Sequence, residues 1–409
     1  MNVSLKGTRL KRMTAVGTVA LTSVALAACG SSKSSSSSKT TTTTSGGSST
    51  VNISPAAFTV DFSAMAQLKS LAAKGKGNVA VLLPDTQTSA RYVSFDAPYL
   101  TQAFKAAGLT TSQFTVTNAQ GSKSTMQTQA EAAITNGASV LVVDPLDSGS
   151  GAAIETAAKA KGVATIDYDR ITLQGASSYY VSFDNVVVGQ KIGQGLVDCN
   201  TAWKVAKPQV LEMDGDPTDN NAKLFAQGYN SVLQPKFTSG AYVKVGEPAG
   251  TWDAPTALTN FQQQFTAHPN INSVVAANDG IANSVISVLK TNNIPARKIP
   301  TTGQDATLQG LQNILTGYQC MSVYKPIYVE AQATVAVALY LRAGQTPPAS
   351  LVNGKTNNQV TDVPSVLLTP ISVTTTNMNA TVIKDKFVTA SALCAGAVAS
   401  ACTTAGITP

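Results

Sequence analysis

The stretch Thr165-Ile166-Asp167-Tyr168-Asp169-Arg170 is an apolar, β-type run that ends in an acid followed directly by a base. Adjacent charges are uncommon in a protein core, so the end of this predicted strand is a candidate functional site. A surface ion pair at an ordinary strand end would look the same and would contribute little to stability. The stretch alone favours neither interpretation, and the rest of the chain has to decide between them.

Strands and helices alternate on both sides of this stretch. The predicted strands are short apolar runs of the kind found in buried parallel sheets, at residues 78–83, 113–117, 139–143, 165–170, 179–183, 209–213, 241–246, 273–277 and 301–304. The predicted helices lie at residues 62–73, 98–107, 125–136, 152–161, 187–199, 223–233, 256–266, 281–290 and 328–341. This alternation indicates an α/β fold with doubly wound parallel sheets and right-handed crossovers.

The length of 409 residues predicts more than one hydrophobic core, because a single core rarely serves a chain of this size. A composition with 43% hydrophobic residues can supply two cores. The α/β pattern runs once up to residue 170 and then repeats. We therefore expect two lobes, with ligands bound beyond the carboxyl ends of their strands.

The N-terminus has the layout of an export signal. Four basic residues precede an apolar run at residues 13–28, and this run is too short for a comfortable transmembrane helix. It ends in Leu26-Ala27-Ala28-Cys29, which resembles the lipobox of bacterial lipoproteins and implies cleavage before Cys29 and lipidation of its sulfur. We expect a signal peptide at residues 1–28 and a Ser/Thr-rich flexible linker at residues 29–50; an uncleaved anchor helix is the alternative.

Charge and cysteine content narrow the possible partners. Without the four basic residues of the signal, 25 Lys and Arg face 22 acids, and no basic cluster stands out, so a nucleic-acid partner is not expected. The four remaining cysteines allow three pairings, of which we favour the near neighbours Cys394 and Cys402 and, by elimination, Cys199 with Cys320. No metal site is expected, because there is no CxxC motif and the single histidine, His268, lies in a predicted loop.

Polar residues follow nearly every predicted strand: Asp85, Asp144, Asp169, Arg170, Asp214, Asn278, Asp279 and Asp305. Any one of them is more simply explained as a helix cap or turn former. As a set spread over two lobes, they would pool in one cleft. Carboxylates, amides and guanidinium groups there could bind the hydroxyls of a neutral polyhydroxylated molecule, and aromatic rings such as Tyr92 and Trp252, both in predicted loops, could cover its apolar faces.

Six ordered motifs carry a family resemblance. They are Asp167-Tyr168-Asp169-Arg170, Ser182-Phe183-Asp184-Asn185, Asp219-Asn220-Asn221-Ala222-Lys223, Ala277-Asn278-Asp279, Gly303-Gln304-Asp305-Ala306 and Val323-Tyr324-Lys325-Pro326. In this order and spacing they resemble the D-xylose-binding proteins of bacterial ABC importers, which belong to the type I periplasmic sugar-binding family. The resemblance covers roughly residues 77–346, and the tail beyond matches less well.

The resemblance implies two lobes joined by a three-segment hinge that close on one monosaccharide. By motif, the residues expected to hydrogen-bond the sugar are Arg91, Asp169, Arg170, Asn221, Asn278, Asp305 and Lys325. Tyr92 and Trp252 would sandwich its ring, although xylose-binding members tend to have Trp at the position of Tyr92, which leaves the exact pentose or hexose open. Asp219 and Asn220 would shape the loop that presents Asn221.

The strand order places the lobe boundaries. We expect the chain to leave the first lobe just after Arg170, to return near residues 321–325 and to cross again near residues 364–370. The N-terminal lobe would then comprise residues 77–170 and 321–366, and the C-terminal lobe residues 171–320 and 367–409. Residues 51–76 would form an N-terminal extension with a short helix.

These features predict an exported, lipid-anchored substrate-binding protein of an ABC importer, monomeric and without a cofactor. A sugar sensor that delivers its liganded state to a membrane receptor is an alternative. A carbohydrate-acting hydrolase is a further one, because the pairs Asp167/Asp169 and Asp214/Asp216 supply two carboxylates each. Against a hydrolase, alternate residues of one strand share a face, and no GxSxG motif is present.

Overall fold

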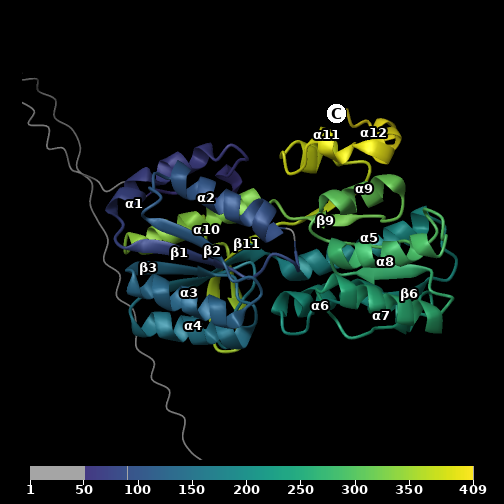
Figure 1. Cartoon of the computed structure of the whole chain (residues 1–409), viewed down its shortest axis with the longest axis horizontal. Helices are drawn as coiled ribbons and strands as arrows, with labels where there is room; N and C mark the ends of the chain where they lie inside the picture. Colours follow the sequence, from purple (N-terminus) through teal and green to yellow (C-terminus); the bar gives the residue numbers. More distant parts are fainter. Residues whose placement is uncertain (1–50, 90, 409) are drawn as a thin grey trace, which may run out of the picture. The chain divides into compact units, whose positions relative to one another are not determined.

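The computed structural model describes residues 51–89 and 91–408. A seven-stranded sheet forms the centre of the first lobe (Figure 1). The strand order is β10-β11-β5-β4-β3-β1-β2, and only β10 and β11 pair antiparallel. The strands are β1 (Asn78–Leu83), β2 (Phe114–Asn118), β3 (Ala138–Val143), β4 (Ala164–Tyr168), β5 (Tyr179–Phe183), β10 (Gly354–Asn357) and β11 (Asp362–Leu368). The predicted signal peptide, Cys29 and the linker lie outside the described residues.

Both faces of this sheet are covered by helices. Along β1, Val79, Val81 and Leu83 join the core beneath α2 (Ala97–Ala106) and α10 (Ile327–Arg342), whereas Ala80 and Leu82 join the core beneath α3 (Lys123–Thr135) and α4 (Ser148–Ala160). Successive side chains of a strand point to opposite faces, so a strand covered on both sides must be apolar throughout. This explains why β1 reads as a continuous apolar run.

The N-terminal extension packs on the same face as α10. It contains the short turn η1 (Pro55–Ala57), the 3₁₀ turn η2 (Ser63–Leu68) and the helix α1 (Lys69–Lys74), so the predicted short helix is present with a tighter first part. Phe58, Phe62 and Leu68 are buried in the first-lobe core, and the Gln332 side chain of α10 donates to the Thr59 carbonyl at 2.9 Å.

The second lobe has a three-stranded parallel sheet, β7-β6-β8, and a two-stranded antiparallel pair, β9-β12. The backbone of residues 300–305 runs between these two sheets. The Val274 N–H of β8 donates to the Pro300 carbonyl, and the Val323 N–H of β9 donates to the Gly303 carbonyl. The strands are β6 (Gln209–Met213), β7 (Val243–Gly246), β8 (Ser273–Ala276), β9 (Ser322–Tyr324) and β12 (Ile371–Val373). The second lobe is completed by the helices α5 (Asn185–Ala202), α6 (Asn220–Thr238), α7 (Ala254–Ala267), α8 (Asp279–Thr291) and α9 (Leu308–Thr316). Helix α9 was not predicted. The strand predicted at residues 301–304 is only an isolated bridge at Thr301.

The chain crosses between the lobes three times, but the first crossing was misplaced, and the expected first-lobe segment 321–366 began too early, because β9 pairs with β12 of the second lobe. Strand β5 pairs with β4 and β11, so residues 171–183 belong to the first lobe and the chain leaves it at Asp184. It returns after β9, at Lys325, and crosses last between Leu368 and Ile371. The error has a physical reason: the partner that seats β5 in the first sheet is β11, which comes much later in the sequence, and a local pattern carries no sign of it.

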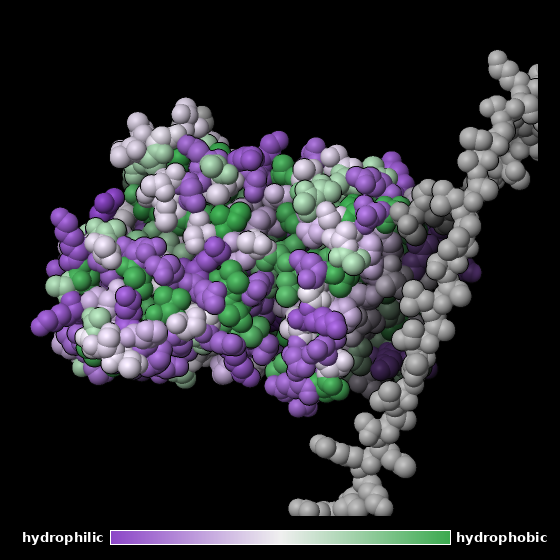
Figure 2. All heavy atoms as spheres, turned by 180° about the vertical axis from the view of Figure 1, so that it is seen from behind, coloured by the Kyte–Doolittle hydropathy of each residue, from purple (hydrophilic) through white to green (hydrophobic). Residues whose placement is uncertain are grey.

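Residues 374–408 form a compact C-terminal cap on the second lobe, coloured yellow in Figure 1. The cap contains η4 (Asn379–Ile383), α11 (Ala390–Leu393), η5 (Gly396–Val398) and α12 (Ala399–Thr404). Its apolar residues form a separate core with residues of α9 and β12. On the face seen in Figure 2, hydrophobic residues lie in small patches among hydrophilic ones. Within the described ranges, no helix combines the length and the hydropathy needed to cross a bilayer.

Both predicted disulfides are confirmed. Cys199 at the end of α5 is bonded to Cys320 just before β9, and Cys394 is bonded to Cys402 within the C-terminal cap. The first bond closes a loop of 121 residues and the second a loop of 8.

The two disulfides should differ in their effect on stability. In the chain-entropy account, closing the longer loop contributes about 5 kcal/mol and closing the shorter one about 2.5 kcal/mol. The double substitution of Cys199 and Cys320 by Ser should therefore lower the urea unfolding midpoint more than the same change at Cys394 and Cys402. Equal midpoints, or the reverse order, would contradict this account.

Candidate functional site

A cavity lies where the carboxyl ends of strands from both lobes face each other. The space between its lining side chains is about 320 Å³, a figure that includes volume open to solvent. Its lining comprises Thr88, Ser89, Arg91, Tyr92, Asp169, Arg170, Asp219, Asn221, Phe225, Trp252, Asn278, Gln304, Asp305 and Lys325. All nine residues that the sequence singled out for ligand binding are among them, so the fold brings the predicted set together.

Several of these side chains lie at the ends of regular elements. Asp169 and Arg170 follow β4, Asn221 lies in the first turn of α6, and Asn278 caps α8 by accepting the Ile281 N–H at 2.9 Å. Lys325 follows β9 at the second crossing.

Trp252 lies in the predicted loop, between β7 and α7, but the loop prediction for Tyr92 is wrong. Tyr92 begins η3 (Tyr92–Asp96), a π-type turn that leads into α2. Such turns recur at functional sites, and short windows of sequence do not reveal them.

The backbone of Asp169 adopts a left-handed conformation, with φ of 57°. This is unfavourable for a residue other than glycine and persists only when its surroundings fix it. Here the Asp169 carbonyl accepts three hydrogen bonds, from Tyr180 Oη at 2.9 Å, Ser182 Oγ at 2.8 Å and Asn221 Nδ2 at 3.0 Å. Asn221 belongs to the second lobe, so this contact joins the lobes at the site.

The Asp169 carboxylate is held by positive charge. Arg91 Nη1 lies 2.7 Å and Lys325 Nζ 3.6 Å from Oδ1, and Tyr92 Oη donates to Oδ2 at 3.3 Å. Burial alone would raise the pKa of Asp169, but Arg91, Lys325 and Arg170 together hold it well below its usual value. Asp169 therefore stays ionised and can accept hydrogen bonds from a ligand.

Arg91 is the most heavily paired cation of the site. In addition to Asp169, it donates to Asp96 through Nε and Nη2, at 2.9 and 2.7 Å, and to Glu330 of α10 at 2.6 Å. All four side chains are buried. Three carboxylates around one guanidinium fix its plane and direction.

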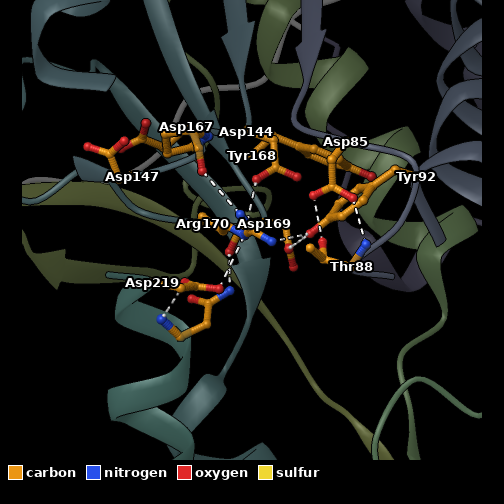
Figure 3. A network of polar contacts seen from close by, with 12 residues as sticks. Asp85, Thr88, Tyr92, Asp144, Asp147, Asp167, Tyr168, Asp169, Arg170 and Asp219 are labelled. Carbon is orange, nitrogen blue, oxygen red and sulfur yellow. Dashed lines mark hydrogen bonds and ion pairs between the residues drawn. The ribbon is translucent and has the colours of Figure 1, made fainter. Parts of the chain in front are cut away.

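Arg170 connects the lobes, as Figure 3 shows. Its Nε lies 3.2 Å from Asp219 of the second lobe and 3.7 Å from Asp144, and its Nη2 donates to Tyr92 Oη at 3.0 Å. Arg170 is only 7% exposed, so the surface ion pair considered for this strand end is excluded.

Asp219 has a larger part than its predicted role in shaping a loop. Its carboxylate caps the Asn221 N–H at 2.8 Å, pairs with Arg170 and accepts from Trp252 Nε1 at 3.1 Å. Trp252 also packs edge-on against Phe225, with ring centroids 6.4 Å apart. The acid belongs to one of the six motifs, but its contacts with Arg170 and Trp252 join segments that are distant in the sequence.

Asp305 and its neighbour Gln304 offer free acceptors. Asp305 Oδ2 accepts from Ser89 of the first lobe at 3.1 Å, and Lys325 Nζ lies 3.7 Å from Oδ1. Among the described residues, Asp305 Oδ1 and Gln304 Oε1 have no hydrogen-bond partner, although both are buried. Buried acceptors are normally satisfied, so a ligand that donates hydrogen bonds fits here.

Three of the polar residues at strand ends serve the fold instead. Asp85 accepts the N–H groups of Gln87 and Thr88, Asp214 accepts from Tyr229, and Asp279 accepts from Thr307, Gln319 and Ser322. The explanation as a turn former is correct for Asp85, whereas Asp214 and Asp279 accept hydrogen bonds from residues distant in the sequence.

One group of acids could in principle hold a cation. Glu212, Asp214 and Glu247 bring carboxylate oxygens within 4.8 Å of one another. However, Lys244 Nζ lies 2.7 Å from Glu212 and also contacts Glu247, and so already supplies a positive charge there.

Gly215 should be required for the position of Trp252. A Cβ at residue 215 would lie 2.1 Å from the indole ring, so Gly215→Ala must displace it. We expect a shift in Trp252 emission, measured in a Trp203→Phe background, and a loss of about 1–3 kcal/mol in unfolding free energy. Gly149→Ala, on α4 and beside only the Asp147 side chain, is the control. Unchanged emission in Gly215→Ala would contradict the packing.

Glu330 should make the protein less stable as the pH rises. Burial raises the pKa of its carboxyl to about 8, against the opposing effect of Arg91. Between its usual pKa and this value the folded state keeps a proton that the unfolded state releases. The free energy of unfolding therefore falls with rising pH, by at most about 1.4 kcal/mol per pH unit from this group.

Thermal unfolding between about pH 5 and pH 8 tests this linkage. The melting temperature should fall across this range, and it should fall less steeply in Glu330→Gln. Asp214 and Asp279, whose pKa values burial raises to about 7, contribute to the remaining slope. If the melting temperature falls equally steeply with pH in the parent and in Glu330→Gln, the carboxyl of Glu330 is not the group that releases the proton on unfolding.

Comparison with known proteins agrees with this geometry. Residues 79–346 match the family model described as a periplasmic binding protein domain. The D-xylose-binding periplasmic protein of Escherichia coli is 38% identical over 274 residues, which cover 66% of this chain and 80% of that protein. A multiple sugar-binding periplasmic receptor of Rhizobium radiobacter is 32% identical, with coverage of 75% and 89%.

Solved structures give the same result. A carbohydrate transporter solute-binding protein from Chloroflexus aurantiacus, in complex with D-glucose, superposes with a TM-score of 0.70 at 29% identity and covers 77% of this chain and 97% of its own. An ABC transporter solute-binding protein from Clostridium phytofermentans, with bound β-D-glucose, has a TM-score of 0.69 at 28% identity, with coverage of 77% and 99%. The chain therefore belongs to the type I periplasmic sugar-binding protein family.

Proposed function

We propose that this chain is the extracytoplasmic substrate-binding lipoprotein of an ABC importer and captures one monosaccharide, D-xylose or a related aldose, between its lobes. The observation that carries the proposal is a pair of buried oxygens, Gln304 Oε1 and Asp305 Oδ1, which belong to residues lining the cavity and accept no hydrogen bond from any residue that the structure describes. Each sugar hydroxyl can donate one hydrogen bond and accept others. Two adjacent hydroxyls would satisfy both acceptors at once.

The charges of the cavity favour a neutral ligand. Each of its three cations already has carboxylate partners: Arg91 with Asp96 and Asp169; Arg170 with Asp219; and Lys325 with Asp169 and Asp305. An anionic ligand would have to displace one of these carboxylates at a high desolvation cost. A neutral polyol can instead use the donors and acceptors that the ion pairs leave free.

The roles of the nine residues follow from their chemistry. Arg91, Asp169, Arg170, Asn221, Asn278, Asp305 and Lys325 hydrogen-bond the sugar, while the rings of Tyr92 and Trp252 cover its faces. Tyr92 supplies a smaller ring than Trp, and its hydroxyl is engaged by Arg170 and Asp169. This leaves room at the ring position and is compatible with more than one aldose.

The relatives point to the same ligand class. Proteins similar to this chain are named D-xylose-binding or multiple sugar-binding, and two structural neighbours carry glucose. They are solute-binding proteins rather than enzymes. The pair Asp167/Asp169 also suits a hydrolase poorly, because Asp167 is buried and engaged by Thr172 and Ser177, away from the cavity lining.

Binding would shift an equilibrium between open and closed lobes. Three contacts in the present arrangement cross the cleft: Ser89 with Asp305, Asn221 with the Asp169 carbonyl, and Arg170 with Asp219. A lipid on Cys29 and the linker at residues 29–50 would tether the lobes near a permease. Delivery to a receptor instead of a permease is the second candidate, and co-purification with either membrane protein separates the two.

Calorimetric titration with a panel of pentoses and hexoses tests the proposal. We expect saturable heat with D-xylose or a related aldose, one sugar per chain. Asp305→Ala should weaken binding by at least about 2 kcal/mol, because it removes an acceptor and leaves Lys325 with fewer partners. Asp198→Ala, at an exposed position on α5, is the matched control and should bind as the parent does. Absence of heat with every sugar would refute the proposal.

A further inference from the structure

The C-terminal cap, residues 374–408, lies outside the residues that match the family model. It has its own apolar core, to which Met378, Val382 and Leu393 contribute, and the Cys394–Cys402 disulfide ties its last two helices together. In Figure 1 it rests on α9 of the second lobe and extends toward the first. No residue of the cap lines the sugar cavity, so its contact with the first lobe is unexplained by the site itself.

That contact is an aromatic stack. The ring of Phe387 in the cap lies on the ring of Phe95 in η3, with centroids 3.9 Å apart and an angle of 15° between the planes. Phe387 is 5% exposed and belongs to the core of the cap, whereas Phe95 belongs to the first lobe. The stack therefore crosses from one lobe to the other.

The stack is the middle of a longer row of rings. The ring centroid of Phe95 lies 6.0 Å from that of Tyr99 of α2, and the centroid of Tyr99 lies 5.7 Å from that of Phe62 in the N-terminal extension. On the other side, Phe387 lies 4.9 Å from Tyr324 at the end of β9, next to the second crossing. The row thus connects the extension, η3, the cap and one hinge strand.

Phe95 is built into the turn that carries the sugar site. Tyr92, which lines the cavity, is the first residue of η3, and Asp96, which fixes the Arg91 guanidinium through two hydrogen bonds, is the last. Because Phe95 lies between them on a single five-residue turn, a displacement of the turn at Phe95 would also move the backbone that carries Tyr92 and Asp96. The other two residues of the turn, Val93 and Ser94, have exposed side chains.

We propose that Phe387 is a positioning residue for sugar binding: the cap holds Phe95, and through it η3, in the arrangement that presents Arg91 and Tyr92 to the ligand. The inference rests on the proposed function, since it concerns the same cavity. It assigns the C-terminal cap a role in affinity, although the cap touches no ligand.

The test compares Phe387→Ala, Phe95→Ala, the double variant and the conservative Phe95→Tyr. Phe265→Ala is the control, because Phe265 stacks on Phe261 at 5.4 Å wholly within the second lobe. Affinity for the best-binding sugar of the panel is measured by calorimetry. Hydrogen–deuterium exchange of peptides covering residues 91–99 is measured without ligand.

We expect each alanine variant to bind about tenfold more weakly, the loss of a stacked aromatic pair and its burial being of that order. The double variant should be no weaker than the worse single variant by more than about twofold, because both remove one contact. Phe95→Tyr should bind like the parent, and exchange at residues 91–99 should rise in the alanine variants but not in Phe265→Ala. Phe387 belongs to the core of the cap, so Phe387→Ala could unfold the cap. Phe95 lies in η3, outside the cap, so Phe95→Ala tests the same contact with the cap core unchanged.

Parental affinity in folded Phe95→Ala, or fully additive losses in the double variant, would overturn the proposal. If the parent protein binds no sugar of the panel, the proposed function fails, and the exchange data alone decide the positioning role. Unchanged exchange at residues 91–99 in both alanine variants would then overturn it.

Discussion

The site depends on a buried network of charges shared between the lobes. Asp169 lies at its centre, with Arg91 and Lys325 on its carboxylate and Asn221 of the opposite lobe on its carbonyl. Buried charges are costly unless each is paired in good geometry. The first lobe, the second lobe and the crossing strand must therefore meet in one register for the network to form, and that register is also the one that encloses the cavity.

This network contributes to geometry more than to overall stability. One apolar core extends from the first sheet to α5 and α6 of the second lobe, and further cores lie on the other face of that sheet and within the second lobe, while the ion pairs orient a few side chains. Two site residues, Asp169 and Asp305, have positive φ, at 57° and 95°. Strained backbone of this kind is typical of functional sites, where the surroundings maintain it for the sake of side-chain direction.

Much of this could be predicted from the sequence. The strands β1, β3 and β8 appear as apolar runs because both of their faces are covered, and strand ends carry polar residues because the fold places them around a cleft. The motif-based resemblance selected nine residues that now line one cavity. The two disulfides followed from the number and spacing of the cysteines.

What could not be predicted depends on contacts between distant segments. The lobe of β5 is decided by its pairing with β11, and the importance of Asp219 by Arg170 and Trp252 reaching it from elsewhere. Gln304 belongs to one of the six motifs, but only the structure shows that its side-chain oxygen is buried and accepts no hydrogen bond from the described part of the chain. The cap gave no recognisable pattern, because its short turns depend on packing against α9 and β12.

A crystal structure of the protein with D-xylose would test the central claim most directly. The account predicts one sugar in the cavity, with hydroxyl oxygens about 2.5–3.0 Å from Asp305 Oδ1 and about 2.7–3.2 Å from another polar group of the lining. It also predicts a hydroxyl on Gln304 Oε1 and the rings of Tyr92 and Trp252 on either side of the ligand. A sugar bound elsewhere, or bound in the cavity with Asp305 Oδ1 and Gln304 Oε1 still unpaired, would contradict it.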